Sequence, residues 1–206
     1  MKLYYAPGAC SIGIHVLLEE IGKPYQAEIV NFRDGAQYKP PFTGLNPKSK
    51  VPTLERDDGS ILTEFPVIAF WLGMQNPEAN LIPKDSETMI RAAEAMEYIV
   101  GTIHSQGFTR LFRTERFAPS AADHDKVKAQ GRENIDKGFA VVDKALEGKN
   151  YLGGDDLSIA DAALFYVEFW GAKRVGLQLP KNCAAHFDRM MARPAVQRAL
   201  QQEGMN

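Results

Sequence analysis

The sequence predicts two domains of different class: an α+β domain with the element order β-α-β-α-β-β-α over residues 1–76, followed by an all-α helical bundle over residues 87–206. Two observations lead to this division. Short apolar runs bounded by turn residues dominate the first third of the chain, whereas helical periodicity dominates the rest. Between them, residues 77–86 form a polar segment interrupted by prolines, which is typical of a linker.

The composition argues against several classes of protein. With 206 residues, of which 45% are hydrophobic, the chain can bury one large core or two small ones. Its formal net charge of −2 favours neither nucleic acid nor an anionic membrane as a partner. No run approaches the roughly 18 apolar residues that a membrane span needs, no apolar signal region opens the chain, and Cys10 and Cys183 do not look like a disulfide framework. We therefore expect a cytoplasmic protein.

The first predicted elements are a strand over residues 2–5 and a helix over residues 12–21. The strand has the large aromatic and aliphatic side chains of a half-buried pleat, and turn residues end it. The helix has apolar residues at i, i+3, i+4 and i+7 and ends at Gly22. Cys10 and Ser11 therefore fall in its first turn.

Cys10 is the first candidate functional residue. At a helix start the backbone N–H groups have no helical partner, and the helix dipole presents its positive end. Because a thiolate is stabilised there, we expect the pKa of Cys10 to lie below the free value of about 8.5. The residues alone leave two interpretations open, namely a reactive thiol or a small buried residue near a helix cap.

The rest of the first domain continues the alternation of strands and helices. Residues 26–30 indicate a second strand, parallel to the first across a right-handed crossover. Residues 31–45 contain a Pro-Pro pair, so only short helical turns are expected there. A hairpin over residues 53–63 supplies two antiparallel strands, and Thr63 is the expected cap of a last helix with Pro66 in its first turn. This order is the thioredoxin-like arrangement.

The bond between Val51 and Pro52, which opens the third strand, is the expected place for a cis peptide. Pro52 cannot donate to a strand ladder. The backbone N–H and C=O of Val51 are therefore expected to face whatever approaches that edge.

The second domain shows helical patterns in five segments, residues 86–117, 122–146, 162–172, 180–192 and 194–202. The third segment is so apolar that we expect it to be a central buried helix. Ser158 with Asp161 three residues later is a variant of the capping box that opens this helix.

Three motifs resemble, in order and spacing, those of the cytosolic glutathione S-transferases, most closely the bacterial beta class: Tyr4-Tyr5-Ala6-Pro7-Gly8-Ala9-Cys10-Ser11, Asn46-Pro47-x-x-x-Val51-Pro52 and Ser158-Ile159-Ala160-Asp161. The resemblance covers essentially the whole chain. It implies an N-terminal domain that binds glutathione as a co-substrate, a helical domain that completes a hydrophobic site, and a homodimer.

The resemblance also implies roles for residues of the first domain. Cys10 matches the cysteine that contacts the glutathione sulfur and can form a mixed disulfide with it. Val51 matches the residue whose backbone pairs with the cysteinyl part of glutathione, and its neighbours Lys50 and Pro52 belong to the same binding segment.

The γ-glutamyl end of glutathione is assigned by resemblance to Glu64 and Phe65, which match the pair that holds it at a helix N-terminus. The family usually has a small or hydroxyl residue where this chain has Phe65, and Pro66 lacks an N–H. A lost hydrogen bond weakens binding by about 1 kcal/mol. Phe65 and Pro66 therefore favour an alternative interpretation, a non-catalytic module of the same fold that serves dimerisation or partner binding.

By the same resemblance the catalytic residues are Cys10, Ser11 and His104. His104 matches a histidine that reaches the active site from the first long helix of the second domain, although its spacing alone also suits a packed core histidine. Ser11 and Tyr5 are competing donors to the thiolate, because other branches of the family use serine or tyrosine there. The structural alternatives for these two residues are a helix cap and a core aromatic.

The second substrate is expected to be a small apolar electrophile. The aromatic residues that could line its site are Phe108, Phe112, Tyr166 and Phe169, although such a stripe is more often simple core. Arginines alternate with aromatic residues over 108–117, but in a net acidic chain a solvated helix face is favoured over a nucleic-acid site. The histidines show no metal-ligand spacing, so no metal is expected.

The sequence leaves the reaction open. No second cysteine follows Cys10 by two residues, so its thiol must work with an external one, for which glutathione is the obvious candidate. Either the glutathione thiolate attacks an electrophile, or Cys10 attacks a disulfide and free glutathione resolves the adduct. A specialised glutathione-dependent lyase, isomerase or dehalogenase is a further alternative.

Overall fold

The computed structural model describes residues 1–205, which form two compact units. The first unit comprises Met1–Ile82 together with the C-terminal segment from Met190 onward. The second unit comprises Pro83–Arg189.

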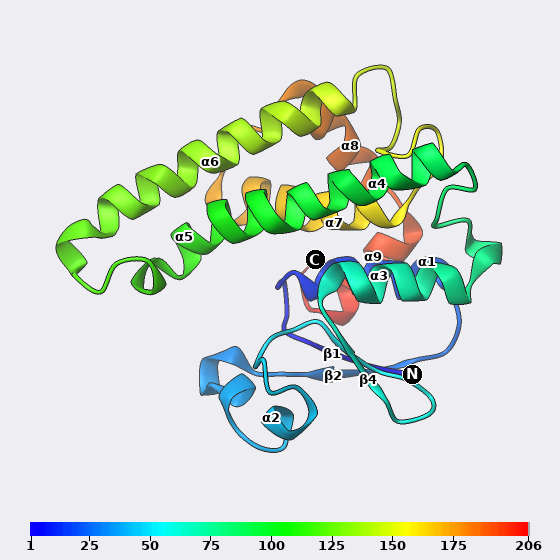
Figure 1. Cartoon of the computed structure of the whole chain (residues 1–206), viewed down its shortest axis with the longest axis horizontal. Helices are drawn as coiled ribbons and strands as arrows, with labels where there is room; N and C mark the ends of the chain where they lie inside the picture. The colour runs from blue at the N-terminus through cyan, green and yellow to red at the C-terminus, as the bar shows by residue number, and fades with distance from the viewer. Residues whose placement is uncertain (206) are drawn as a thin grey trace. The chain divides into compact units, whose positions relative to one another are not determined.

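The first unit contains a four-stranded sheet in the order β2-β1-β3-β4 (Figure 1). Its elements are β1 (Lys2–Tyr5), α1 (Ser11–Ile21), β2 (Gln26–Ile29), η1 (Phe32–Asp34), η2 (Ala36–Tyr38), α2 (Phe42–Leu45), β3 (Thr53–Glu55), β4 (Ile61–Thr63), α3 (Phe65–Gln75) and η3 (Pro77–Ala79). Strands β1 and β2 are parallel, and the other two pairs are antiparallel. The predicted order β-α-β-α-β-β-α is confirmed.

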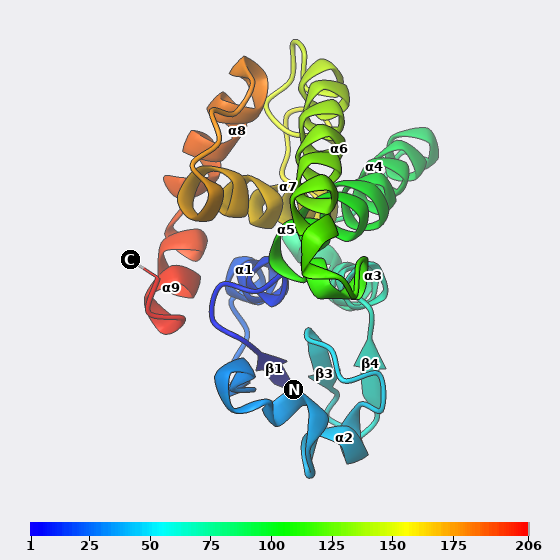
Figure 2. The same ribbon diagram turned by 90° about the vertical axis from the view of Figure 1, so that its left-hand side faces the viewer.

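The strand register brings three connecting segments to one edge of the sheet. Tyr4 pairs with Thr53, and Thr53 pairs with Thr63. The turn after β1, the loop before β3 and the turn after β4 therefore all leave the sheet at the same end. Helices α1 and α3 lie side by side and cover one face of the strands (Figure 2), where fully buried Leu3 and Leu54 form part of the core.

Two local predictions in this unit have different outcomes. The bond between Val51 and Pro52 is cis, as predicted. The predicted cap of α3 at Thr63 is wrong, because β4 continues through Thr63 and the N-cap is Glu64, with φ 71°. A preference of threonine for caps is local, whereas the length of β4 depends on its pairing with β3.

The second unit is built of helices joined by loops, one of which contains an isolated β-bridge between Tyr151 and Gly154. Its elements are α4 (Ser86–Tyr98), the π-helical stretch η4 (Ile99–Phe108), α5 (Thr109–Phe112), η5 (Thr114–Arg116), η6 (Ala121–Asp123), α6 (His124–Ala145), α7 (Ile159–Phe169), the π-helical stretch η7 (Trp170–Val175) and α8 (Lys181–Met191), whose last two residues lie in the first unit. The long helix predicted over 86–117 ends at Phe112 and is followed by a 3-10 turn.

Glycines permit the close crossing of η4 and α6. A Cβ atom on Gly107 would lie 2.6 Å from Cγ1 of Ile135, and one on Gly138 would lie 2.5 Å from Cγ1 of Ile103. Any other residue type would force the facing isoleucine side chain or the helix itself to shift.

Helix α7 is the centre of the second unit, and all its residues are buried. The predicted capping box is confirmed, since both the N–H and the hydroxyl of Ser158 donate to Oδ2 of Asp161, at 2.7 and 2.8 Å. Within the described residues, no helix has the length and apolar character that crossing a membrane requires.

The last helix, α9 (Pro194–Gln202), packs against α1 and belongs to the first unit. Its buried residues are Ala195, Val196, Ala199 and Leu200. Arg193 adds a two-pronged ion pair with Glu20 of α1, with N–O distances of 2.5 and 2.9 Å. The sequence places all of 87–206 in the second domain, because helical periodicity shows that a face will be buried but not against which partner.

Candidate active site

The thiol of Cys10 lies at the sheet edge where the three connecting segments meet. Cys10 is the N-cap of α1 and is partly exposed. Its Sγ atom donates a hydrogen bond to the backbone carbonyl of Val51, at 3.4 Å. The structure thus brings together the two residues that the sequence placed against the sulfur and the cysteinyl part of glutathione.

Burial raises the pKa of the Cys10 thiol to about 12. The backbone N–H groups of Cys10 and Ser11 and the positive charge of Lys50 act in the opposite direction, while Glu203 adds to the increase. The expected decrease in pKa is therefore wrong. Losing water destabilises the Cys10 thiolate more than the helix start and the charge of Lys50 stabilise it. At neutral pH Cys10 carries its proton and acts as an S–H donor.

Ser11 and Tyr5 form hydrogen bonds with the backbone around this turn. Ser11 is fully buried, and its hydroxyl exchanges hydrogen bonds with the N–H and C=O of Ala6, at 3.3 and 3.4 Å. The hydroxyl of Tyr5 donates to the carbonyl of Gln202, at 3.4 Å. These bonds favour the cap and core interpretations for the two residues over a role as thiolate donor.

Asn46 organises the loop that presents Val51. Its amide nitrogen donates to the carbonyl of Lys50 and to the hydroxyl of Thr53, at 2.8 and 2.9 Å, and its amide oxygen accepts the N–H of Lys48 at 3.0 Å. The side chain is buried. The sequence analysis placed Asn46 in a motif but gave its side chain no role, although an asparagine before a proline is a known turn signal.

Glu64 occupies a backbone conformation that favours glycine, with φ 71° and ψ 123°. Such strain in a non-glycine residue is found mainly at functional sites. Nζ of Lys48 donates to the Glu64 carboxylate and to the hydroxyl of Thr63, both at 2.8 Å. Phe65, the first residue of α3, has a buried side chain, so the position that the family usually gives to a hydroxyl group is here part of the core.

In the second unit, His104 lies in an aromatic cluster. Its Nδ1 atom is 3.1 Å from the hydroxyl of Tyr166, and the ring of Trp170 meets it edge-on with centroids 4.9 Å apart. Three of the four predicted lining residues, Phe108, Tyr166 and Phe169, are buried, whereas Phe112 is 39% exposed. This distribution fits the core interpretation for the first three and leaves Phe112 on the surface.

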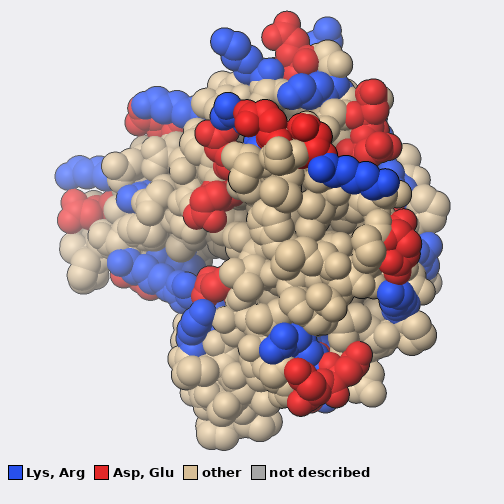
Figure 3. Space-filling view, turned by 45° about the vertical axis from the view of Figure 1, so that its right-hand side comes forward, with Lys and Arg blue, Asp and Glu red and all other residues tan. Residues whose placement is uncertain are grey.

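The described part of the chain holds no group of three or more His, Cys, Asp or Glu side chains that could bind a metal ion. On the face drawn in Figure 3, Lys and Arg side chains are interspersed with Asp and Glu side chains. Such mixing of opposite charges is typical of a solvated surface rather than of a nucleic-acid footprint.

The family is decided by comparison with known proteins. Residues 8–75 match the glutathione S-transferase N-terminal domain, and residues 93–194 match the C-terminal domain. Over the full length of both chains, the sequence is 35% identical to glutathione S-transferase GstA of Escherichia coli O157:H7. The chain belongs to the glutathione S-transferase family.

Solved structures of other family members superpose over nearly the whole chain. A glutathione transferase homologue from Sulfitobacter with bound glutathione has a TM-score of 0.91 and 30% identity, covering 100% of this chain and 98% of that one. The beta class glutathione S-transferase of Sphingomonas chungbukensis has a TM-score of 0.85 and 32% identity, with 100% of both chains covered. These matches confirm the thioredoxin-like and helical domains of the fold class.

Proposed function

We propose that this member of the family binds glutathione at the sheet edge of its first unit and joins glutathione, through its sulfur, to small apolar electrophiles. The observation that carries the proposal is the 3.4 Å contact between Sγ of Cys10 and the carbonyl of Val51, beside the cis bond to Pro52. Related structures that contain bound glutathione support the choice of ligand.

In the proposed binding mode, backbone hydrogen bonds and charged groups hold glutathione. The N–H and C=O of Val51 pair with the cysteinyl part of glutathione, as an added strand would. The Glu64 carboxylate receives the γ-glutamyl ammonium group, and the N-terminus of α3, which begins at Phe65, favours the γ-glutamyl carboxylate. Lys50, whose charge already acts on Cys10, supplies a cation for the remaining carboxylate.

In the proposed reaction Cys10 is a hydrogen-bond donor. Because its pKa is raised, it keeps its proton and can turn its S–H from Val51 towards the glutathione sulfur. A donor so placed stabilises the glutathione thiolate. Glutathione releases its thiol proton to solvent. The thiolate attacks the electrophilic carbon, a carbon–sulfur bond forms, and the leaving group departs with its electron pair. For Ser11 and His104 as further catalytic residues, and for Phe112 as part of the hydrophobic site, the proposal rests on the family pattern.

We also propose that the protein is a cytoplasmic homodimer with a role in detoxification. The family pattern supports these statements, and apolar side chains on α3 support a protein partner, since Val67 is 50% and Met74 61% exposed. The molar mass measured by size-exclusion chromatography coupled to light scattering would test the dimer. A monomer mass at micromolar protein concentration would contradict it.

The test of the proposed function is retention on immobilised glutathione followed by turnover of 1-chloro-2,4-dinitrobenzene. Wild type should be retained and active, Cys10→Ala should lose about tenfold or more in kcat/KM, and the matched control Cys183→Ala should keep its activity. Turnover on disulfide substrates alone would favour exchange through Cys10. Absence of both retention and turnover would favour the non-catalytic module, and unchanged rates in Cys10→Ala would contradict the role given to that thiol.

A further inference from the structure

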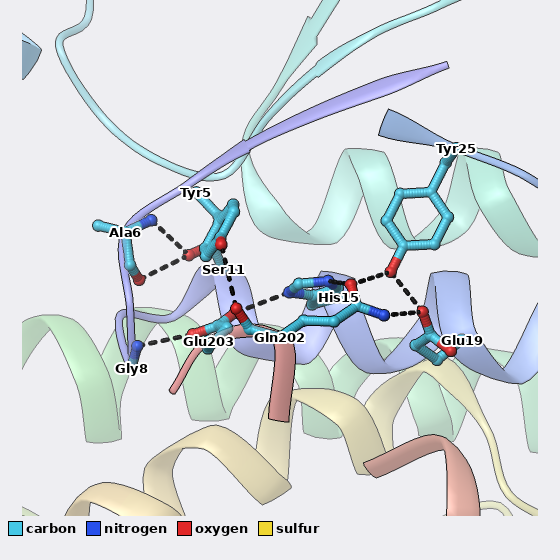
Figure 4. A network of polar contacts seen from close by, with 9 residues as sticks. All are labelled: Tyr5, Ala6, Gly8, Ser11, His15, Glu19, Tyr25, Gln202 and Glu203. Carbon is cyan, nitrogen blue, oxygen red and sulfur yellow. Dashed lines mark hydrogen bonds and ion pairs between the residues drawn. The ribbon is translucent and has the colours of Figure 1, made fainter. Parts of the chain in front are cut away.

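The segment after α9 contacts the turn that carries Cys10 (Figure 4). The side chain of Glu203 is completely buried. One carboxylate oxygen accepts the backbone N–H of Gly8 at 2.7 Å, and the other lies 2.9 Å from Nδ1 of His15 on α1. Gly8 is two residues before Cys10, in the turn between β1 and α1.

Both ring nitrogens of His15 have hydrogen-bond partners. Its Nε2 atom lies 2.8 Å from Oε1 of Gln202. The orientation of that amide follows from its other end, because its nitrogen donates to the Glu19 carboxylate at 2.8 Å. Both ring nitrogens of His15 thus face oxygen acceptors, and only the doubly protonated imidazolium can donate to both.

Aromatic side chains and a second carboxylate complete the surroundings of this pair. The ring centroids of Tyr5 and Tyr25 lie 5.1 and 5.7 Å from that of His15. The hydroxyl of Tyr25 donates to Glu19 at 2.5 Å. The Glu203 carboxylate and the His15 ring therefore meet beside two aromatic side chains.

We propose that Glu203 is a positioning residue for Cys10: its carboxylate, neutralised by the His15 imidazolium, holds the Gly8 N–H and thereby the turn that presents the thiol. This inference rests on the proposed function for its biological meaning but not for its test. A carboxylate bound to a backbone N–H and to an imidazolium makes two charge-assisted hydrogen bonds, which define a geometry more strictly than neutral ones do.

Glu203 also has an electrostatic effect on the thiol. Its negative charge contributes to the raised pKa of Cys10. The residue that positions the turn thus also helps to keep Cys10 in the S–H form that the proposed reaction uses.

The first test measures the pH dependence of Cys10 alkylation by iodoacetamide, followed by mass spectrometry of the Cys10 peptide. Glu203→Gln keeps an oxygen for Gly8, and the carboxylate charge and the His15 proton are lost together, so the alkylation rate at pH 8.5 should stay within about twofold of wild type. Glu203→Ala also loses the acceptor, so its alkylation profile should depart from those of both wild type and Glu203→Gln. Gln201→Ala, an exposed neighbour on α9, is the matched control and should follow wild type. Wild-type profiles in both folded Glu203 variants would overturn the proposal.

The second test records the ring nitrogen resonances of His15 by NMR at pH 7. Two protonated ring nitrogens are expected in wild type, and one neutral tautomer in Glu203→Gln. A neutral His15 in wild type would overturn the charged pair. Neither test uses glutathione or an electrophile, so loss of the proposed transferase activity would leave both results readable, and a failed test would leave the transferase proposal standing.

Discussion

Each unit buries a histidine against carboxylate groups, but the two clusters differ in their charge. In the first unit, His15 lies between Glu203 and a neutral amide, at 2.9 and 2.8 Å. In the second unit, His186 of α8 lies between two carboxylates of α7, with Glu168 at 2.8 Å and Asp161 at 3.2 Å. The histidine faces one carboxylate in the first cluster and two in the second.

In the second cluster the two carboxylates outnumber the single histidine, and this affects the hydrogen bonds and the pKa values of the cluster. Oε1 of Glu168 is buried and has no hydrogen-bond partner among residues 1–205. Burial raises the pKa of Glu168 to about 7, against the opposing effect of His186. Burial lowers the pKa of His186, but Glu168 and Asp161 more than offset this and raise it to about 10. The comparison teaches that a buried histidine–carboxylate contact can lie against the turn before Cys10 in one place and join two helices, with a pH-dependent strength, in another.

The largest effect is expected from His186→Ala. Removing the imidazolium takes the facing positive charge from two buried carboxylates, so the free energy of unfolding should fall by about 3–5 kcal/mol, measured by denaturant unfolding at pH 7. His124→Ala is the control, because His124 is only partly buried and makes one contact, 3.1 Å from the carbonyl of Ala118. It should cost about 1 kcal/mol or less. Equal losses of unfolding free energy in the two variants would show that the contacts of His186 with Glu168 and Asp161 contribute no more to stability than a single hydrogen bond does.

A smaller loss, about 2–3 kcal/mol, is expected from His15→Ala. Glu203 then loses its counter-ion but keeps the N–H of Gly8. The measurement is the same unfolding experiment, together with the alkylation rate of Cys10. A loss as large as that of His186→Ala would break the comparison, because it would mean that a single carboxylate is as costly to leave unpaired as two.

The pH dependence of stability should come mainly from the second cluster. The pKa of His186 is raised in the folded state, so its stabilising effect is complete below its ordinary value of 6.5 and is lost as pH rises towards about 10. Glu168, whose pKa is also raised, acts in the same direction as pH rises through about 7. The free energy of unfolding should therefore fall by about 3–4 kcal/mol between pH 6.5 and 9.5.

His186→Gln sharpens this measurement. The variant should show a flatter dependence of unfolding free energy on pH over the same range. If it keeps the full wild-type slope, groups outside the cluster of Asp161, Glu168 and His186 cause the dependence.

The smallest effect is expected from a substitution of Asn46, an uncharged residue of the first unit. Asn46→Ala removes three hydrogen bonds within the loop that presents Val51, so KM for glutathione should rise about tenfold or less, with a smaller change in kcat. Asn134→Ala is the control, since Asn134 is only partly buried on α6 and donates to the carbonyl of Gln106. A wild-type KM in Asn46→Ala would show that the loop is held by Pro52 and the sheet alone.

Much of the fold could be predicted from the sequence because the motifs that begin and end its helices span only a few neighbouring residues. Gly22 ends α1 with φ 72°, and the capping box of Ser158 and Asp161 opens α7, as expected. The segments that differ are those where an element depends on a distant neighbour. Helix α9 has an ordinary apolar periodicity, and only its contact with α1 assigns it to the first unit.

The candidate site divides in the same way. The place of Cys10 at the start of α1 and the cis bond before Pro52 follow from local chemistry. The direction of the pKa shift does not, because a helix start lowers the pKa of a thiol while burial raises it, and burial depends on every segment packed around the turn. The sequence alone therefore predicted the wrong sign.

The amino-acid sequence by itself determined the element order, the family, and the presence of a thiol at a helix start near the Val51–Pro52 edge. These depend on residues within a few positions of one another and on motifs in a recognisable order. Only the tertiary structure decided that the C-terminal segment returns to the first unit and that Glu203 and His15 meet beside Gly8. The physical reason is that hydrogen bonding and desolvation act through space, between residues that the chain keeps far apart.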